Sequence, residues 1–219
     1  MVSLTARNQK RTAERSVVVG VSDHNGWAVL VSAAIANGAP AVVDRRRVSL
    51  IEDGVPSQPY HHETLALGDA ESEQLLHKVR RSIAACTEHA LRQLAADLFP
   101  RYRVAAVTIR HPPLADLPPT VGEVHRSYHA TCRADGMLYH SAICEAARQR
   151  DWELVLHRRG DEMAIAAAAL QAGTHQVERF VEDLKHTLKA PWTAEHRCAF
   201  ASAIGRLGTQ SRVRLPRID

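Results

Sequence analysis

The first fifty residues contain three short apolar segments separated by two turn sequences, and this pattern constrains the fold most. Residues 17–21 are almost all valine, and the polar turn sequence 23–26 follows them. A second apolar segment covers residues 27–34, and a third covers residues 41–51 after a break that contains Gly38 and Pro40. Strands joined by such short connections pair as hairpins. The sequence therefore predicts an antiparallel meander of three strands.

The next part of the chain predicts a long helix followed by a buried strand. Apolar residues recur at helical spacing over residues 70–98, and Asp69 is the expected N-cap. Pro100 stops this helix. Residues 104–109 then form a continuous apolar run, which is typical of a strand covered on both faces.

The second half of the chain predicts further alternation of helix and strand. Thr120 and Glu123 have capping-box spacing, so we expect a helix from there towards residue 150, interrupted near Asp135-Gly136. Residues 153–157 predict a fifth strand. Three more helices are expected, over residues 161–172, 176–188 and 193–204. Gly205 is the expected C′ residue of the last one.

Composition indicates one globular domain with a basic tail at each end. The chain has 219 residues, of which 45% are apolar and 24% charged, and these are globular values. Residues 1–15 and 206–219 each carry a net charge of +3, whereas the domain between them, residues 16–205, carries −2. Basic tails bind phosphate backbones without reading sequence, although they are also common as solvated ends.

No apolar run approaches the ~20 residues of a membrane span, and the first fifteen residues lack the apolar stretch of a secretory signal. The sequence therefore predicts a cytoplasmic protein with no membrane contact. Its four cysteines form no C-x-x-C pair, so we expect free thiols.

The predicted order β-β-β-α-β-α-β-α resembles that of the ribonuclease H-like superfamily, and within it the RuvC/YqgF branch. The resemblance covers residues 16–205. Two segments support it: VVVGVSDHNGWAVLV (residues 17–31) is similar to the first hairpin of that branch, and AEHRCAFASAIG (residues 194–205) is similar to its last helix. It implies an α/β fold in which helices cover both faces of a mixed five-stranded sheet.

The resemblance also implies a cluster of carboxylates that binds Mg²⁺ or Mn²⁺ for phosphodiester hydrolysis. Asp23 matches the acid of the first strand, and Glu195 matches an acid of the last helix. With a shifted alignment, Asp161 or Glu162 supplies the middle acid. The fourth strand itself ends in Arg110, and Cys198 stands at the second acidic position of the last helix. We expect the Asp23 carboxylate to face the start of that helix.

Thirteen histidines are unusually many for a chain of this length and predict a second kind of site. One expected Zn²⁺ site gathers side chains at a single edge of the sheet, namely Asp23, His24, His61, His62 and Glu63. His125 and His129 are four residues apart and are expected to share a helix face. The alternative is that these histidines are polar surface residues.

Three functions remain open from the sequence. The first is a ribonuclease H-like protein that acts on nucleic acid by metal-dependent hydrolysis. The second is a non-catalytic binding or scaffold protein of the same fold, and the third is a histidine-rich metal-dependent hydrolase. The sequence contains no P-loop, no G-x-G-x-x-G and no kinase signature, which argues against nucleotide enzymes of those kinds.

Overall fold

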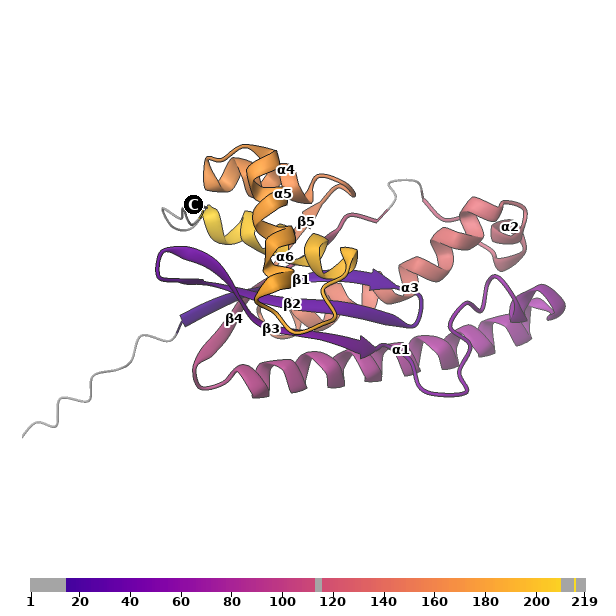
Figure 1. Ribbon diagram of the computed structural model, residues 1–219. Helices are drawn as coiled ribbons and strands as arrows, with labels where there is room; N and C mark the ends of the chain where they lie inside the picture. Colours follow the sequence, from indigo (N-terminus) through magenta and orange to yellow (C-terminus); the bar gives the residue numbers. More distant parts are fainter. Residues whose placement is uncertain (1–14, 113–115, 210–214, 216–219) are drawn as a thin grey trace, which may run out of the picture.

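A five-stranded sheet forms the centre of the computed structural model, which describes residues 15–112, 116–209 and 215 (Figure 1). The strands lie in the order β3-β2-β1-β4-β5. Their bounds are β1 (Arg15–His24), β2 (Trp27–Ala36), β3 (Ala39–Ser49), β4 (Tyr102–Arg110) and β5 (Glu153–His157).

The pairing of the strands confirms the predicted mixed sheet. β1 and β2 pair antiparallel, as do β2 and β3, so the first three strands form the expected meander. β4 pairs parallel with β1, and β5 pairs parallel with β4. The carboxyl ends of β1, β4 and β5 therefore meet at one edge of the sheet.

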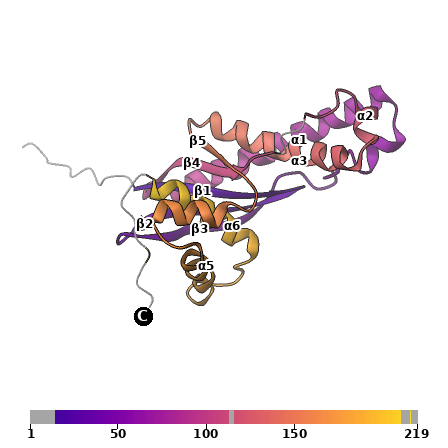
Figure 2. The same cartoon turned by 90° about the horizontal axis from the view of Figure 1, so that it is seen from above.

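Helices cover both faces of this sheet (Figure 2). The helices are α1 (Asp69–Leu98), α2 (Val121–His125), α3 (Tyr128–Arg148), α4 (Glu162–Leu170), α5 (Thr174–Asp183) and α6 (Ala194–Gly208), with short 3₁₀ turns η1 (Glu63–Ala66) and η2 (Leu184–His186). α1 and α3 lie on one face, and α4, α5 and α6 lie on the other.

The side chains of β1 divide the core into two halves. Val17, Val19 and Val21 pack with α1 and α3, whereas Val18 packs with α4, α5 and α6. This alternation follows from the two-residue period of a strand. The fourth strand is also buried on both faces, because Val107 packs in the first half and Ala106 in the second.

Three predicted helix boundaries were wrong. Gly68, not Asp69, is the N-cap of α1, and its N–H donates to Glu71 Oε2 at 3.3 Å. The helix expected after Thr120 does begin with a capping box, but it breaks at residues 126–127 and runs unbroken through Gly136.

The third wrong boundary is at Gly205, which lies inside α6 rather than after its end. A Cβ at this position would lie 2.5 Å from Ile165 Cγ2 of α4. Gly205 is therefore explained by the close packing of two helices, which a single sequence does not distinguish from a helix stop.

The folded domain includes one basic residue from each of the two predicted tails. Arg15 lies in β1 and Arg206 lies in α6, where it forms an ion pair with Glu153, so both belong to the folded domain. The other basic residues of the two predicted tails lie outside the described residues. In the described part of the chain, no helix combines the length and apolarity needed to span a membrane.

The contact between β1 and α6 generates a stability prediction. A Cβ on Gly20 would lie 1.7 Å from the backbone oxygen of Ala199. Gly20→Ala should therefore lower the free energy of unfolding by about 3 kcal/mol or more, because helix backbone has to move. Gly136→Ala is the matched control, because a Cβ there meets nothing within 4 Å. It should raise stability by about 0.5–1 kcal/mol. Urea unfolding of both variants tests this, and equal effects would contradict it.

Candidate functional site

The alternation of β1 decides which of its last residues face α6. Gly20 contacts the backbone of α6 at Ala199. The even-numbered residues that follow, Ser22 and His24, therefore face the same helix. Both line a cavity together with Glu195 of α6.

Asp23 faces the opposite way, so the prediction that its carboxylate faces the start of the last helix was wrong. Its Oδ2 lies 3.9 Å from Nδ1 of His140 on α3. Arg110 Nη2 donates to the Asp23 backbone oxygen at 2.8 Å and lies 3.2 Å from Oδ1. The physical reason is that β1 continues through His24, so strand alternation still applies at Asp23. The residue that faces α6 is Ser22.

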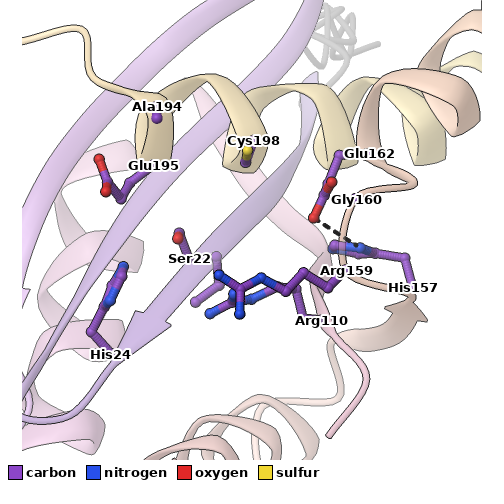
Figure 3. A pocket seen from close by; sticks show the side chains of 11 residues that line it. Ser22, His24, Arg110, His157, Arg159, Gly160, Glu162, Ala194, Glu195 and Cys198 are labelled. Atoms are coloured by element: carbon purple, nitrogen blue, oxygen red, sulfur yellow. Dashed lines mark ion pairs between the residues drawn. The ribbon is translucent and has the colours of Figure 1, made fainter. Parts of the chain in front are cut away.

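The cavity that contains Ser22 and His24, here called the edge cavity, has a volume of about 250 Å³ (Figure 3). It lies where β1, β4 and β5 end and α6 begins. Figure 3 shows Glu195 and Cys198 on the α6 side, with Arg110 and Arg159 facing them.

Two of the predicted acids line the edge cavity. Glu162 is only 5% exposed, and its Oε1 lies 3.7 Å from His157 Nδ1. The Thr193 side chain and the backbone N–H of Glu195 itself hold the pKa of the Glu195 carboxyl below the usual value. Asp161 is exposed and does not line the cavity. Both lining acids therefore already have protein partners.

Two arginine and two histidine side chains form the basic side of the edge cavity. Figure 3 shows the guanidinium groups of Arg110 and Arg159 side by side, with His24 on one flank and His157 on the other. Nε2 of His24 and Nε2 of His157 are buried, and neither has a hydrogen-bond partner among the described residues. Burial lowers the pKa of His24, and the Arg110 charge lowers it further. Two guanidinium groups that line one cavity are suited to an anionic ligand.

The residues of this edge do not fit the Mg²⁺ or Mn²⁺ site implied by the resemblance. Ser22, Arg110 and Cys198 occupy the positions where strand one, strand four and the last helix would supply acids. Burial raises the pKa of the Cys198 thiol, which disfavours the thiolate that binds metal. Within the described ranges, no three His, Cys, Asp or Glu side chains are grouped so that they could hold a metal ion.

The predicted zinc clusters are not formed either. His61 Nδ1 lies 2.7 Å from Asp135 Oδ2, an acid the sequence reasoning had not considered. Among the described residues, His61 does not form a set of three with His24 and Asp23 that could hold a metal ion. His125 ends α2 and His129 lies in α3, so the predicted shared helix face is wrong because the helix breaks between them. His125 Nε2 instead lies 3.0 Å from Thr64 Oγ1.

Sequence reasoning missed the roles of Ser22, Arg159 and His157. Counting alternate residues from Gly20 would have found Ser22, once Gly20 was known to contact α6. Arg159 and His157 become neighbours of Arg110 only because β5 pairs parallel with β4.

The fold of this chain is similar to solved structures of RuvC from Thermus thermophilus. One matches with a TM-score of 0.52 and 12% identity, covering 89% of this chain and 95% of the RuvC chain. A second, "T. thermophilus RuvC in complex with Holliday junction substrate", has a TM-score of 0.51 and 14% identity, covering 91% and 99%. The chain has a RuvC-like ribonuclease H fold. No protein-family model and no curated protein matches its sequence.

The buried histidines predict how stability depends on pH. Burial lowers the pKa of His24, His140 and His196 below the usual 6.5. Below about pH 6.5 the unfolded chain therefore binds more protons than the folded one, and the free energy of unfolding falls as pH falls from 7.5 to 5.5. His24→Gln should make this fall smaller. Urea unfolding at both pH values tests this, and equal or greater stability at pH 5.5 would contradict it.

The misfit of the edge cavity to metal predicts the response to divalent ions. A ligand that binds the folded state raises the melting temperature. Melting curves in Mg²⁺, Mn²⁺, Zn²⁺ and EDTA should therefore coincide within about 1 °C. The prediction would be overturned if Mn²⁺ raised the melting temperature of the wild-type protein and of Glu178→Gln on α5 but not that of Glu195→Gln. That result would establish the metal site.

Proposed function

We propose that this protein binds nucleic acid through the edge cavity and does not hydrolyse it with metal ions. The observation that carries the proposal is the pair Arg110 and Arg159, which line the same cavity as the unpartnered Nε2 atoms of His24 and His157. The two guanidinium groups are a set of N–H donors placed where the fold gathers the carboxyl ends of its parallel strands.

A phosphate group is the ligand that such a set recognises. Arginine presents several N–H donors in a planar group and binds phosphate through paired hydrogen bonds. Most contacts between proteins and nucleic acids are made to phosphate and sugar, and they fix position without reading sequence. Ser22 is only 8% exposed and lines the cavity, and its hydroxyl adds a neutral donor.

The similarity to RuvC supports a choice of probe. One of the similar RuvC structures holds a Holliday junction substrate. A four-way DNA junction is therefore the first ligand to test on this chain, beside a linear duplex and a single strand of the same sequence. The basic residues of the two predicted tails would add non-specific phosphate contacts.

The other two functions left open by the sequence have less support. Metal-dependent hydrolysis needs several oxygen ligands around the ion, and the edge cavity offers Glu162 and Glu195, both of which have protein partners. The histidine-rich hydrolase needs His24, His61 and His62 in one cluster, and the described residues form no such group.

The proposal predicts a specific loss of affinity. Arg159→Gln should weaken binding of the four-way junction by about tenfold. The double variant Arg110→Gln/Arg159→Gln should weaken it further. The slope of log affinity against log salt concentration should fall by about one for each lost phosphate contact. Fluorescence anisotropy of a labelled junction between 50 and 200 mM NaCl measures both quantities.

Arg179→Gln is the matched control, because Arg179 is exposed on α5 and lines neither the edge cavity nor its neighbour. It should change affinity less than twofold. Arg159→Gln is informative alone even if the Arg110 variant does not fold, because Arg159 is exposed. The proposal fails if the wild-type protein binds none of the three nucleic acids, or if Arg159→Gln and Arg179→Gln have the same effect.

A further inference from the structure

A cysteine, a histidine and an aspartate form a chain of contacts on the α3 side of the sheet. Sγ of Cys132 lies 3.5 Å from Nε2 of His61, and Nδ1 of His61 lies 2.7 Å from Oδ2 of Asp135. The proposed function uses none of these three residues. His61 precedes η1, whereas the other two lie in α3, so the contacts join segments about seventy residues apart.

The aspartate fixes the orientation of the histidine. Asp135 has no exposed surface, and its Oδ1 accepts the Tyr60 N–H at 3.0 Å. Because a carboxylate only accepts hydrogen bonds, the His61 proton is placed on Nδ1. Nε2 then presents its lone pair to the Cys132 thiol. This is the relation of nucleophile, base and orienting acid that activates a weak nucleophile.

Cys132 lines a second cavity, here called the α3 cavity. Its volume is about 530 Å³, and Cys132, Arg133 and His140 of α3 line it opposite Asp23 and Arg110. Arg159 and His111 line it as well. The cationic lining favours a negatively charged molecule.

One further group in this region favours chemistry at the thiol. Arg133 Nε is buried and has no hydrogen-bond partner among the described residues, although its Nη2 donates to the Asp116 backbone oxygen. An unused donor next to the nucleophile in the chain is suited to an oxyanion.

We propose that Cys132, His61 and Asp135 form a nucleophilic triad that hydrolyses a negatively charged ester or thioester. Cys132 and His61 act on the reacting atoms, and Asp135 positions His61. The substrate carries its negative charge on a carboxylate or phosphate, because arginines line the α3 cavity.

The reaction proceeds in two balanced steps. His61 Nε2 accepts the thiol proton while Sγ bonds to the acyl carbon, and the bond from that carbon to the leaving oxygen or sulfur then breaks as His61 returns the proton to it. Water next gives a proton to His61 and bonds to the acyl carbon, the carbon–Sγ bond breaks, and the proton returns to Sγ. The products are a carboxylic acid and an alcohol or thiol.

The first experiment measures thiol reactivity with iodoacetamide at pH 7, resolved by cysteine with mass spectrometry. Cys86 is the internal reference, because it is also partly exposed and burial raises the pKa of its thiol. Cys132 should be alkylated at least about tenfold faster than Cys86. His61→Gln should remove that advantage, whereas His62→Gln, at the exposed neighbouring position, should leave it unchanged.

The rate at Cys86 separates loss of activation from unfolding. Unfolding exposes both thiols and therefore accelerates Cys86, whereas loss of activation slows Cys132 and leaves Cys86 unchanged. Asp135→Asn should slow Cys132 without accelerating Cys86, because an asparagine NH₂ facing Nδ1 moves the histidine proton to Nε2. Equal rates at the two cysteines in the wild-type protein would overturn the proposal, as would a ratio that His61→Gln does not change.

The second experiment measures hydrolysis of two p-nitrophenyl esters, the neutral acetate and the anionic hydrogen succinate. The wild-type protein should release p-nitrophenolate faster from the succinate and form an acyl adduct on Cys132. Cys132→Ala keeps the His61–Asp135 contact and should abolish p-nitrophenolate release and the acyl adduct. Cys86→Ser should leave the release and the adduct unchanged. Release that is equal in the wild-type protein and Cys132→Ala would overturn the proposal. These outcomes are independent of DNA binding, so either proposal can fail alone.

Discussion

The close contact between β1 and α6 is the constraint on which the functional edge depends. Only a residue without a side chain at Gly20 allows the backbone of α6 to lie against the strand, since a Cβ would lie 1.7 Å from the Ala199 oxygen. That contact fixes the face of every later residue in β1. Ser22 and His24 face α6 as a result, and Asp23 faces α3 and contacts Arg110.

The two sides of the sheet edge consequently have different chemistry. On the α6 side, two acids already have partners and two arginines line the same cavity, which makes it suited to an anion. On the α3 side, the thiol of Cys132 has a histidine that a buried aspartate orients. Arg110 and Arg159 line both cavities and give both a preference for negative charge.

Most of the fold was predictable from the sequence because it depends on local periodicity. Apolar runs bounded by turn sequences located all five strands, and helical spacing located the helices that cover them. The errors arose where a residue type is typical of one structural role locally but has a different role in the packed structure. Gly205 has the properties of a helix stop but is required by contact with Ile165.

The site was less predictable, because its geometry depends on contacts distant in sequence. Asp23 was expected to face α6 because the resemblance matches it with the acid of the first strand, but β1 continues through His24 and strand alternation turns Asp23 to the other face. Glu162 and Glu195 do line the predicted edge, as expected of acids in those segments. The pairing of His61 with Asp135 has no local signature, because a loop and a helix meet there only in the folded chain.

The measurement that tests the central claim most directly compares binding and cleavage of the same DNA. A labelled four-way junction is incubated with the protein in Mn²⁺, and one half of the sample is run on a native gel and the other on a denaturing gel. The account predicts a shifted band on the native gel and full-length strands on the denaturing gel, with the same shift in EDTA. Strands cut only in Mn²⁺, with cutting abolished by Glu195→Gln, would contradict it.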